Sequence, residues 1–177
     1  TKVSDPNLGT WTWTQVGQDI DGEVAGDLSG NSVSLSNNGN TVAVGAPNND
    51  GNGYNSGHVR LFTKISSPNL GTWTWTQLGQ DINGEETEDY SGKSVSLSSD
   101  GNTIAIGAHH NNGNGINSGH VRLFTKISDP ILGTFTWTQL GQDINGEATL
   151  DWSGYSVSLS SDGNTVAIGA HHNDGNG

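Results

Sequence analysis

A repeat of 62 residues constrains this chain more than any other feature of its sequence. Equivalent tryptophans recur at this spacing, at Trp13, Trp75 and Trp137. The three copies are residues 1–62, 63–124 and 125–177, and the last stops before the segment that reads Gly-His-Val-Arg-Leu-Phe in the second. Self-similarity at such a period indicates an array of equal structural units, each packing against its neighbours.

Each complete copy contains four stretches with the pattern of β-strands. In the second copy they are residues 72–78, 94–98, 103–108 and 119–127. Val95 and Leu97 alternate with serines, which is the period of a strand with one buried face. Gly101 lies in an Asp-Gly-Asn sequence that is typical of a tight turn between two strands. No stretch has the period of a helix.

The four strands predict an all-β fold in which each copy forms one four-stranded antiparallel blade of a β-propeller. Serine, alanine and glycine dominate the two middle strands of a copy, and such small side chains suit the crowded region near a propeller axis. The bulky tryptophans suit the outer strands, where blades diverge. The alternative is a β-solenoid, but its repeats are shorter and its strands pair in parallel.

Three copies, the last of them truncated, predict an incomplete propeller. A closed ring needs about four to eight blades. We therefore expect blade faces and sheet edges to remain exposed. The sequence favours either a piece of a longer array or a protomer that associates with other copies of itself.

Composition excludes several classes of partner. The chain has no cysteine, so it can form neither a disulfide nor a thiolate metal site. Eighteen acidic and six basic residues give a net charge of -12, which repels nucleic acid and anionic membranes. No stretch is apolar enough to cross a membrane. The balance fits an acidic protein at a cell surface or outside the cell.

Three motifs carry a resemblance to a known family. They are Ser-Gly-x-Ser-Val-Ser-Leu-Ser, Asp-Gly-Asn-Thr-Val-Ala-Ile-Gly-Ala and Gly-His-Val-Arg-Leu-Phe, and Val-Ala-Val-Gly-Ala-Pro at 42–47 is the most specific piece. They resemble the FG-GAP repeats of integrin-α-type propellers and their microbial relatives. The resemblance implies extracellular adhesion and ligand binding, with the Ser-Val-Ser strand innermost and the tryptophan strand outermost. The aspartates of the family's calcium loop are reduced here to a single Asp100.

Acidic residues before the Ser-Val-Ser strand are candidate calcium ligands, because calcium is bound by several oxygen atoms gathered around a turn. The candidates in the three copies are Asp19, Asp21, Glu23, Asp27, Asp81, Glu85, Asp89, Asp143, Glu147 and Asp151. The alternative is a structural loop between blades, in which Asp27 and its equivalents accept hydrogen bonds from backbone N–H groups.

Two further clusters merit attention. The Asn/Gly-rich stretch at 48–53 resembles the start of a calcium loop, but its equivalent at 110–115 has no carboxylate and favours a hairpin. Imidazole suits zinc or copper, and the sequence has histidine pairs at 109–110 and 171–172 as well as His58 and His120. Neighbouring residues of a strand point to opposite faces, so we expect the pairs to be surface residues rather than chelators.

We find no nucleophile with a partnering base, and near-identical copies do not resemble the single asymmetric site of an enzyme. The sequence therefore predicts a non-enzymatic extracellular module for adhesion or surface assembly, with glycan or protein partners. Two alternatives remain: a calcium-stabilised ligand-binding propeller and a carbohydrate-active enzyme.

Overall fold

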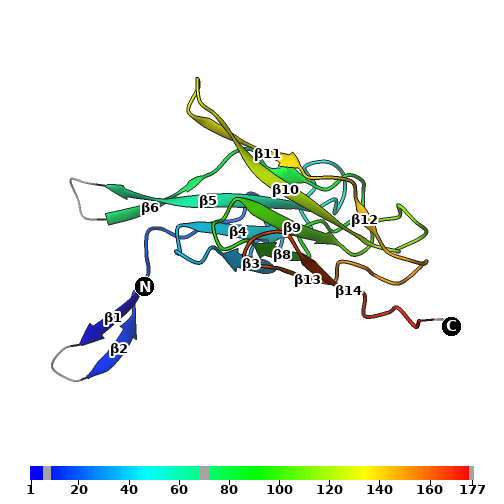
Figure 1. Cartoon of the computed structure of the whole chain (residues 1–177), viewed down its shortest axis with the longest axis horizontal. Helices are drawn as coiled ribbons and strands as arrows, with labels where there is room; N and C mark the ends of the chain where they lie inside the picture. Colours follow the sequence, from blue (N-terminus) through cyan, green and yellow to red (C-terminus); the bar gives the residue numbers. More distant parts are fainter. Residues whose placement is uncertain (6–8, 68–71, 176–177) are drawn as a thin grey trace.

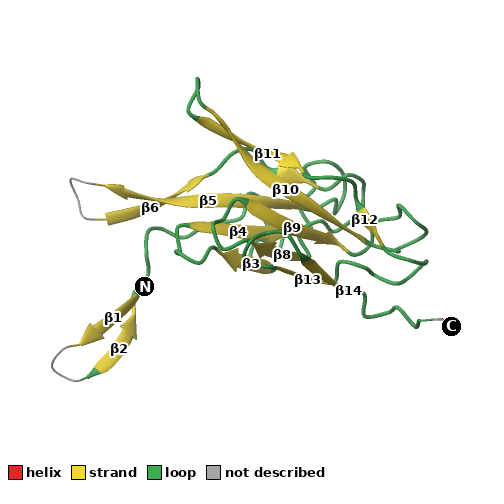
Figure 2. Cartoon of the chain, viewed as in Figure 1, coloured by secondary structure: helices red, strands yellow, loops and turns green. Residues whose placement is uncertain are grey.

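The computed structural model describes residues 1–5, 9–67 and 72–175, and these residues form strands, turns and loops without any helix (Figure 2). Accordingly, no helix in this part of the chain could cross a membrane. The strands are β1 (Lys2–Asp5), β2 (Thr10–Trp13), β3 (Ser32–Leu35), β4 (Thr41–Ala46), β5 (His58–Ser67), β6 (Thr72–Gln77), β7 (Ile82–Asn83), β8 (Ser94–Leu97), β9 (Thr103–Ala108), β10 (His120–Asp129), β11 (Thr134–Gln139), β12 (Ile144–Asn145), β13 (Ser156–Leu159) and β14 (Val166–Gly169).

Two complete blades have the same antiparallel topology. Blade 1 has the strand order β3-β4-β5-β6, and the two-residue strand β7 also pairs with β5. Blade 2 repeats this arrangement as β8-β9-β10-β11, with β12 on β10. The predicted all-β fold of four-stranded propeller blades is confirmed, and the four strands predicted in the second copy are all present. The short strands β7 and β12 were not predicted.

Each blade takes its outermost strand from the next copy of the repeat. Blade 1 begins at Ser32 in the first copy, but its fourth strand, β6, and β7 belong to the second. Blade 2 likewise borrows β11 and β12 from the third copy. The tryptophan strand is outermost, as the resemblance implied, and the blades are therefore offset from the sequence copies.

The third copy contributes an incomplete blade. Its strands β13 and β14 form a two-stranded sheet that packs on blade 2. At the other end of the chain, β1 and β2 form a separate hairpin that lies apart from the blades (Figure 1). About three blades are present, in agreement with the predicted incomplete propeller.

Apolar faces of successive blades make the core. One cluster joins Ala43, Val59 and Leu61 of blade 1 to side chains of blade 2 that include Val95 and Leu97. A second cluster joins Ala105 and Val121 of blade 2 to Leu159 of the third copy. Blade 2 thus packs its front face on blade 1 and its back face on the strands of the third copy, and we use the same names for the equivalent faces of the other units.

Serine side chains form hydrogen bonds between the inner strands of neighbouring blades. Ser32 Oγ donates to the carbonyl of Gly92 at 2.8 Å, and Ser94 Oγ makes the same bond to Gly154. The backbone N–H of Leu97 donates to Ser34 Oγ at 2.9 Å. Small side chains at the axis therefore permit close approach, as expected, and also supply polar contacts between blades.

Candidate functional site

The loops between blades hold three buried aspartates in equivalent positions: Asp27, Asp89 and Asp151. In each, Oδ2 accepts the N–H of the residue three positions earlier, at 2.8 to 3.2 Å. The same oxygen also accepts a hydrogen bond from an asparagine amide in the turn after the second strand. These contacts support the structural alternative for the three aspartates, although the bonded N–H precedes the aspartate rather than opening the next strand.

A second set of aspartates lies at the exit from the tryptophan strand. Asp19, Asp81 and Asp143 each accept a hydrogen bond on Oδ1 from the glutamine four residues earlier, at 2.6 to 2.8 Å. This hydrogen bond fixes the orientation of each carboxylate through Oδ1 and does not involve Oδ2. Asp21 contributes its backbone carbonyl, which accepts a bond from Arg60 at 2.6 Å.

The predicted carboxylates do not converge within one copy. In the described part of the chain, two groups bring three potential metal ligands within 4.8 Å of one another: Glu23, His58 and Asp81, and Glu85, His120 and Asp143. Each group takes its glutamate and histidine from one copy and its aspartate from the next. In the third copy, Glu147 instead approaches the amide of Asn173 at 3.4 Å. The calcium hypothesis for these loops stays a prediction.

The histidine of each group is fully buried while the glutamate remains accessible. His58 and His120 are each 1% exposed. His120 Nδ1 lies 3.9 Å from Glu85 Oε2, and the equivalent distance between His58 and Glu23 is 3.8 Å. Burial, reinforced by the neighbouring Arg122, lowers the pKa of His120 to about 4, so its imidazole is neutral at pH 7.

An arginine side chain lies beside the glutamate of each group. Arg122 Nη1 lies 3.4 Å from Glu85 Oε1, and its Nη2 donates to the carbonyl of Asn83 at 2.7 Å. Burial raises the pKa of Glu85, while the Arg122 charge acts in the opposite direction. The first copy repeats the arrangement with Arg60 and Glu23 at 3.7 Å.

Loop 48–53 is held by its own hydrogen bonds. Asn49 Oδ1 accepts the N–H of Gly51 at 2.8 Å, and Asp50 Oδ1 accepts the N–H of Asn55 at 2.7 Å. Asn52 donates to the carbonyls of Gly84 and Glu85. The loop therefore positions the Glu85 segment of the next blade, which agrees with the hairpin prediction.

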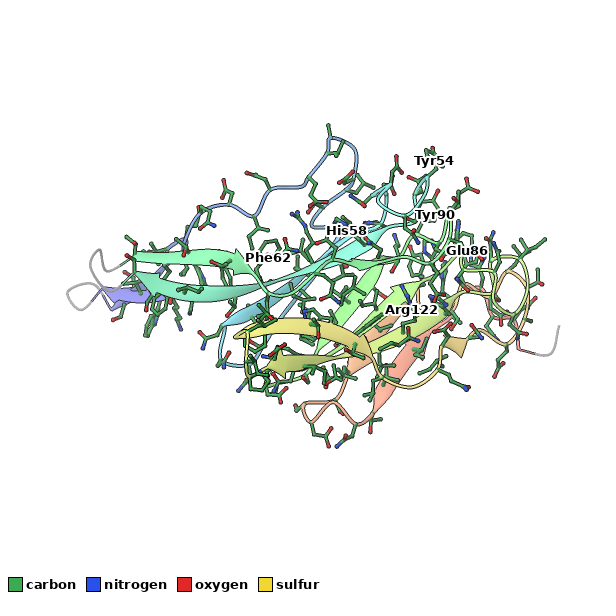
Figure 3. All side chains as sticks on the ribbon, turned by 90° about the horizontal axis from the view of Figure 1, so that it is seen from above. Tyr54, His58, Phe62, Glu86, Tyr90 and Arg122 are labelled. Atoms are coloured by element: carbon green, nitrogen blue, oxygen red, sulfur yellow. The ribbon has the colours of Figure 1, made fainter. Side chains whose placement is uncertain are left out.

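Aromatic and histidine rings gather between blade 2 and the third copy. This aromatic patch consists of Tyr90, His109, His110, Trp152, Tyr155, His171 and His172, and neighbouring ring centroids lie 4.1 to 6.4 Å apart. Trp152 stacks on His172 at 4.1 Å with an interplanar angle of 12°. Lys93 Nζ lies 4.9 Å from the centre of the Tyr155 ring. Figure 3 shows Tyr90 among the loops at one end of the molecule.

The patch corrects one inference from the sequence. His109 and His110 lie in a turn after β9, not in a strand, so their rings do not point to opposite faces. The two ring centroids are 4.2 Å apart. The patch histidines nevertheless form no metal-binding group of three within the residues that the structure describes.

The backbone at the patch is unusual for large side chains. Tyr90 and Trp152 have φ angles of 55° and 56°, and Leu28 in the first copy has 56°. Positive φ is uncommon for bulky residues and costs about 1 kcal/mol or more. The left-handed bend is therefore common to all three copies, and only the second and third place an aromatic ring on it.

Sequence reasoning missed this patch, although a signal was present. The second and third copies differ at few positions, and Glu86, Glu88, Tyr90 and Lys93 are four of them. These residues belong to one short segment. Sequence differences that are concentrated in one segment of a nearly uniform repeat indicate a surface whose side chains change between copies while the fold is kept.

With this arrangement established, the two complete units can be compared with known families. The model of the FG-GAP repeat matches residues 19–62 and 83–124. These two segments are FG-GAP repeats. Each matched segment runs from an inter-blade loop through the first three strands of a blade. No curated protein matches the chain. FG-GAP repeats are a propeller-forming module, and this assignment is consistent with ligand binding without catalysis.

Proposed function

We propose that this chain is a non-enzymatic, extracellular FG-GAP module that binds glycans through the aromatic patch. The proposal rests on one observation: seven aromatic and histidine rings from two neighbouring units lie in contact with one another. Aromatic faces offer a flat apolar surface to the C–H face of a sugar ring. Imidazole nitrogens and the Tyr155 hydroxyl supply hydrogen-bonding groups for the sugar hydroxyls.

Exposure makes the patch suitable for a ligand. Tyr155 is 38% exposed, His171 and His172 are exposed, and Trp152 is partly buried. His109 is only 7% exposed, and its ring packs against the more exposed rings of the patch. A partly buried ring held by rigid neighbours loses little conformational entropy when a ligand binds. The left-handed backbone at Trp152 adds a strained feature of the kind that clusters at binding sites.

A glycan array read for both binding and cleavage tests this proposal. We expect binding that Trp152→Ala reduces at least tenfold. Trp73→Ala is the matched control, because it removes a tryptophan that is 43% exposed but lies away from the patch, on the outer strand β6. Binding that survives Trp152→Ala contradicts the patch as the site. Release of cleaved sugar would favour the carbohydrate-active enzyme instead.

We propose further that copies of the chain associate head to tail. Val33 and Leu35 on the front face of blade 1 are 64% and 58% exposed, whereas their equivalents in blade 2 cover the back face of blade 1. At the other end, Ala167 on β14 is exposed, while its equivalents Ala43 and Ala105 are fully buried. A front face of one chain therefore matches a back face of another.

Sedimentation of the 177-residue chain tests this association. We expect reversible oligomers, because a heterologous contact of this kind can repeat. Leu35→Glu should yield a monomer, whereas Ile65→Glu, on the opposite face of the same sheet, should not. A wild-type chain that remains monomeric at high concentration contradicts the proposal.

A further inference from the structure

Two equivalent clusters of glutamate, histidine and aspartate lie outside the aromatic patch. They are Glu23, His58 and Asp81, and Glu85, His120 and Asp143, with potential ligand atoms within 4.8 Å of one another in each group. The spacing in sequence is the same in both, 35 residues and then 23. This repetition shows that the fold builds the cluster wherever a complete blade is followed by the start of the next copy.

The buried histidine distinguishes these clusters from a chance group of surface carboxylates. His120 is 1% exposed, and neither of its ring nitrogens has a hydrogen-bond partner among the described residues. A buried polar group without a partner costs about 1–3 kcal/mol. Its Nδ1 faces Glu85 Oε2 at 3.9 Å, which is too long for a hydrogen bond. A ligand that both groups could bind would remove this cost.

From these contacts we infer that each cluster is a binding site for a divalent transition-metal ion of the zinc class. One imidazole nitrogen and two carboxylate oxygens are a donor set that zinc accepts, with a fourth position left for water. Calcium and magnesium prefer oxygen ligands alone, and imidazole therefore selects against them. The inference is independent of glycan binding.

The remaining contacts of the cluster suit this role. Arg122 lies beside Oε1 of Glu85, so Oε2 is left to face His120. Gln139 donates to Oδ1 of Asp143 at 2.7 Å and leaves Oδ2 available. Such outer partners orient metal ligands. Bonds of about 2.0–2.2 Å require the ligand atoms to close in by about 1 Å, which the accessible Glu85 side chain can provide.

The three ligands come from the three segments that define a blade joint. Glu85 follows β7 of blade 1, His120 opens β10 of blade 2, and Asp143 directly precedes β12. Since β12 pairs with β10, with Asn145 opposite His120, the aspartate and histidine are held on one sheet. A bound ion would tie the entering loop to that sheet and stabilise the joint.

Calorimetric titration of the full chain with zinc chloride tests the inference. We expect saturable binding whose stoichiometry falls by two ions per chain in the double variant Glu23→Gln/Glu85→Gln. Glu147→Gln is the matched control, because Glu147 is the equivalent glutamate of the third copy and belongs to neither ligand group among the described residues. This variant should retain wild-type stoichiometry.

Cobalt chloride provides a second readout, since four-coordinate Co²⁺ bound by nitrogen and oxygen absorbs strongly in the visible range. We expect this absorption in the wild type and its loss in Asp81→Asn/Asp143→Asn, with zinc but not calcium displacing the cobalt. The side chains of Glu23 and Glu85 are 41% and 39% exposed, so replacing them removes no packed group. Circular dichroism is used to check that each variant keeps the fold. Unchanged stoichiometry in both double variants overturns the inference, as does equal loss in Glu147→Gln.

Discussion

The strand Ser-Val-Ser-Leu occurs three times, and its first two copies lie in contrasting surroundings. In β3, Val33 and Leu35 are 64% and 58% exposed; in β8, Val95 and Leu97 are 9% and 7% exposed. The strands have the same sequence and equivalent antiparallel partners, β4 and β9, which differ only by isoleucine for valine at two positions. The main difference is the neighbouring blade. Burial in this fold is therefore decided between blades, and each unit depends on the next for its stability.

The largest expected effect compares leucines at equivalent positions. Leu97→Ala should reduce the free energy of unfolding by about 2–5 kcal/mol, because it leaves a cavity between two blades. Leu35→Ala should change it by no more than about 0.5 kcal/mol, as is usual for exposed positions. Denaturant unfolding at a dilution where the chain is monomeric measures both. Equal effects would show that the two faces are equally covered.

A glycine provides the next test. A Cβ on Gly107 would overlap the carbonyl oxygen of Gly154 in the next unit, whereas at the equivalent Gly169 it would overlap only the Ser156 hydroxyl, which can rotate away. We expect Gly107→Ala to cost about 1–3 kcal/mol and Gly169→Ala clearly less. Thermal unfolding of the two variants measures the difference, and similar melting temperatures would contradict close contact between the blades.

Serine hydroxyls should have a smaller effect. Ser96 Oγ accepts the N–H of Leu159 at 2.9 Å, while the equivalent Ser158 is exposed. Ser96→Ala should cost about 1 kcal/mol, the usual contribution of one hydrogen bond. Ser158→Ala is the control and should leave the free energy of unfolding unchanged. Hydrogen exchange at the Leu159 amide reports the loss directly.

Mild acid should loosen the joint at the aromatic patch. Burial, with the nearby His110 and Lys93 charges, lowers the pKa of His109 to about 3 from an ordinary value of 6.5. The folded state thus favours the neutral ring, and its stability is fully present above pH 6.5 and falls as the pH drops toward 3. Unfolding of wild type and His109→Gln between pH 7 and 4 measures this, and the variant should show a weaker dependence on pH. An equal dependence of the free energy of unfolding on pH in the two proteins would contradict this expectation.

Periodic features could be predicted from the sequence because they depend on local chemistry. The alternation around Val95 and Leu97 identified β8, and the small residues of 103–108 identified β9 with both ends correct. The Asp-Gly-Asn turn has Gly101 at a φ of 70°. The repeated motifs also led to the correct family.

Contacts between copies could not be read from the sequence. Asp81 belongs to the second copy by sequence but joins Glu23 and His58 of the first, because β7 pairs with β5. Grouping carboxylates within one copy therefore missed the histidine at their centre. The patch was missed for a similar reason, since Trp152 meets His110 only after the blades pack.

The borrowed outer strand also determines how such an array can be lengthened or shortened. A gene segment of 62 codons can be gained or lost at any equivalent pair of positions in two copies. Whatever the breakpoint, every internal blade still receives its inner strands from one copy and its outermost strand from the next. Preparing a single unit is more restrictive: residues 63–124 would carry β7 without the segment of β5 that it pairs with and would lack β11, whereas residues 32–83 contain all five strands of blade 1. The unit that is inherited and the unit that folds therefore have different boundaries.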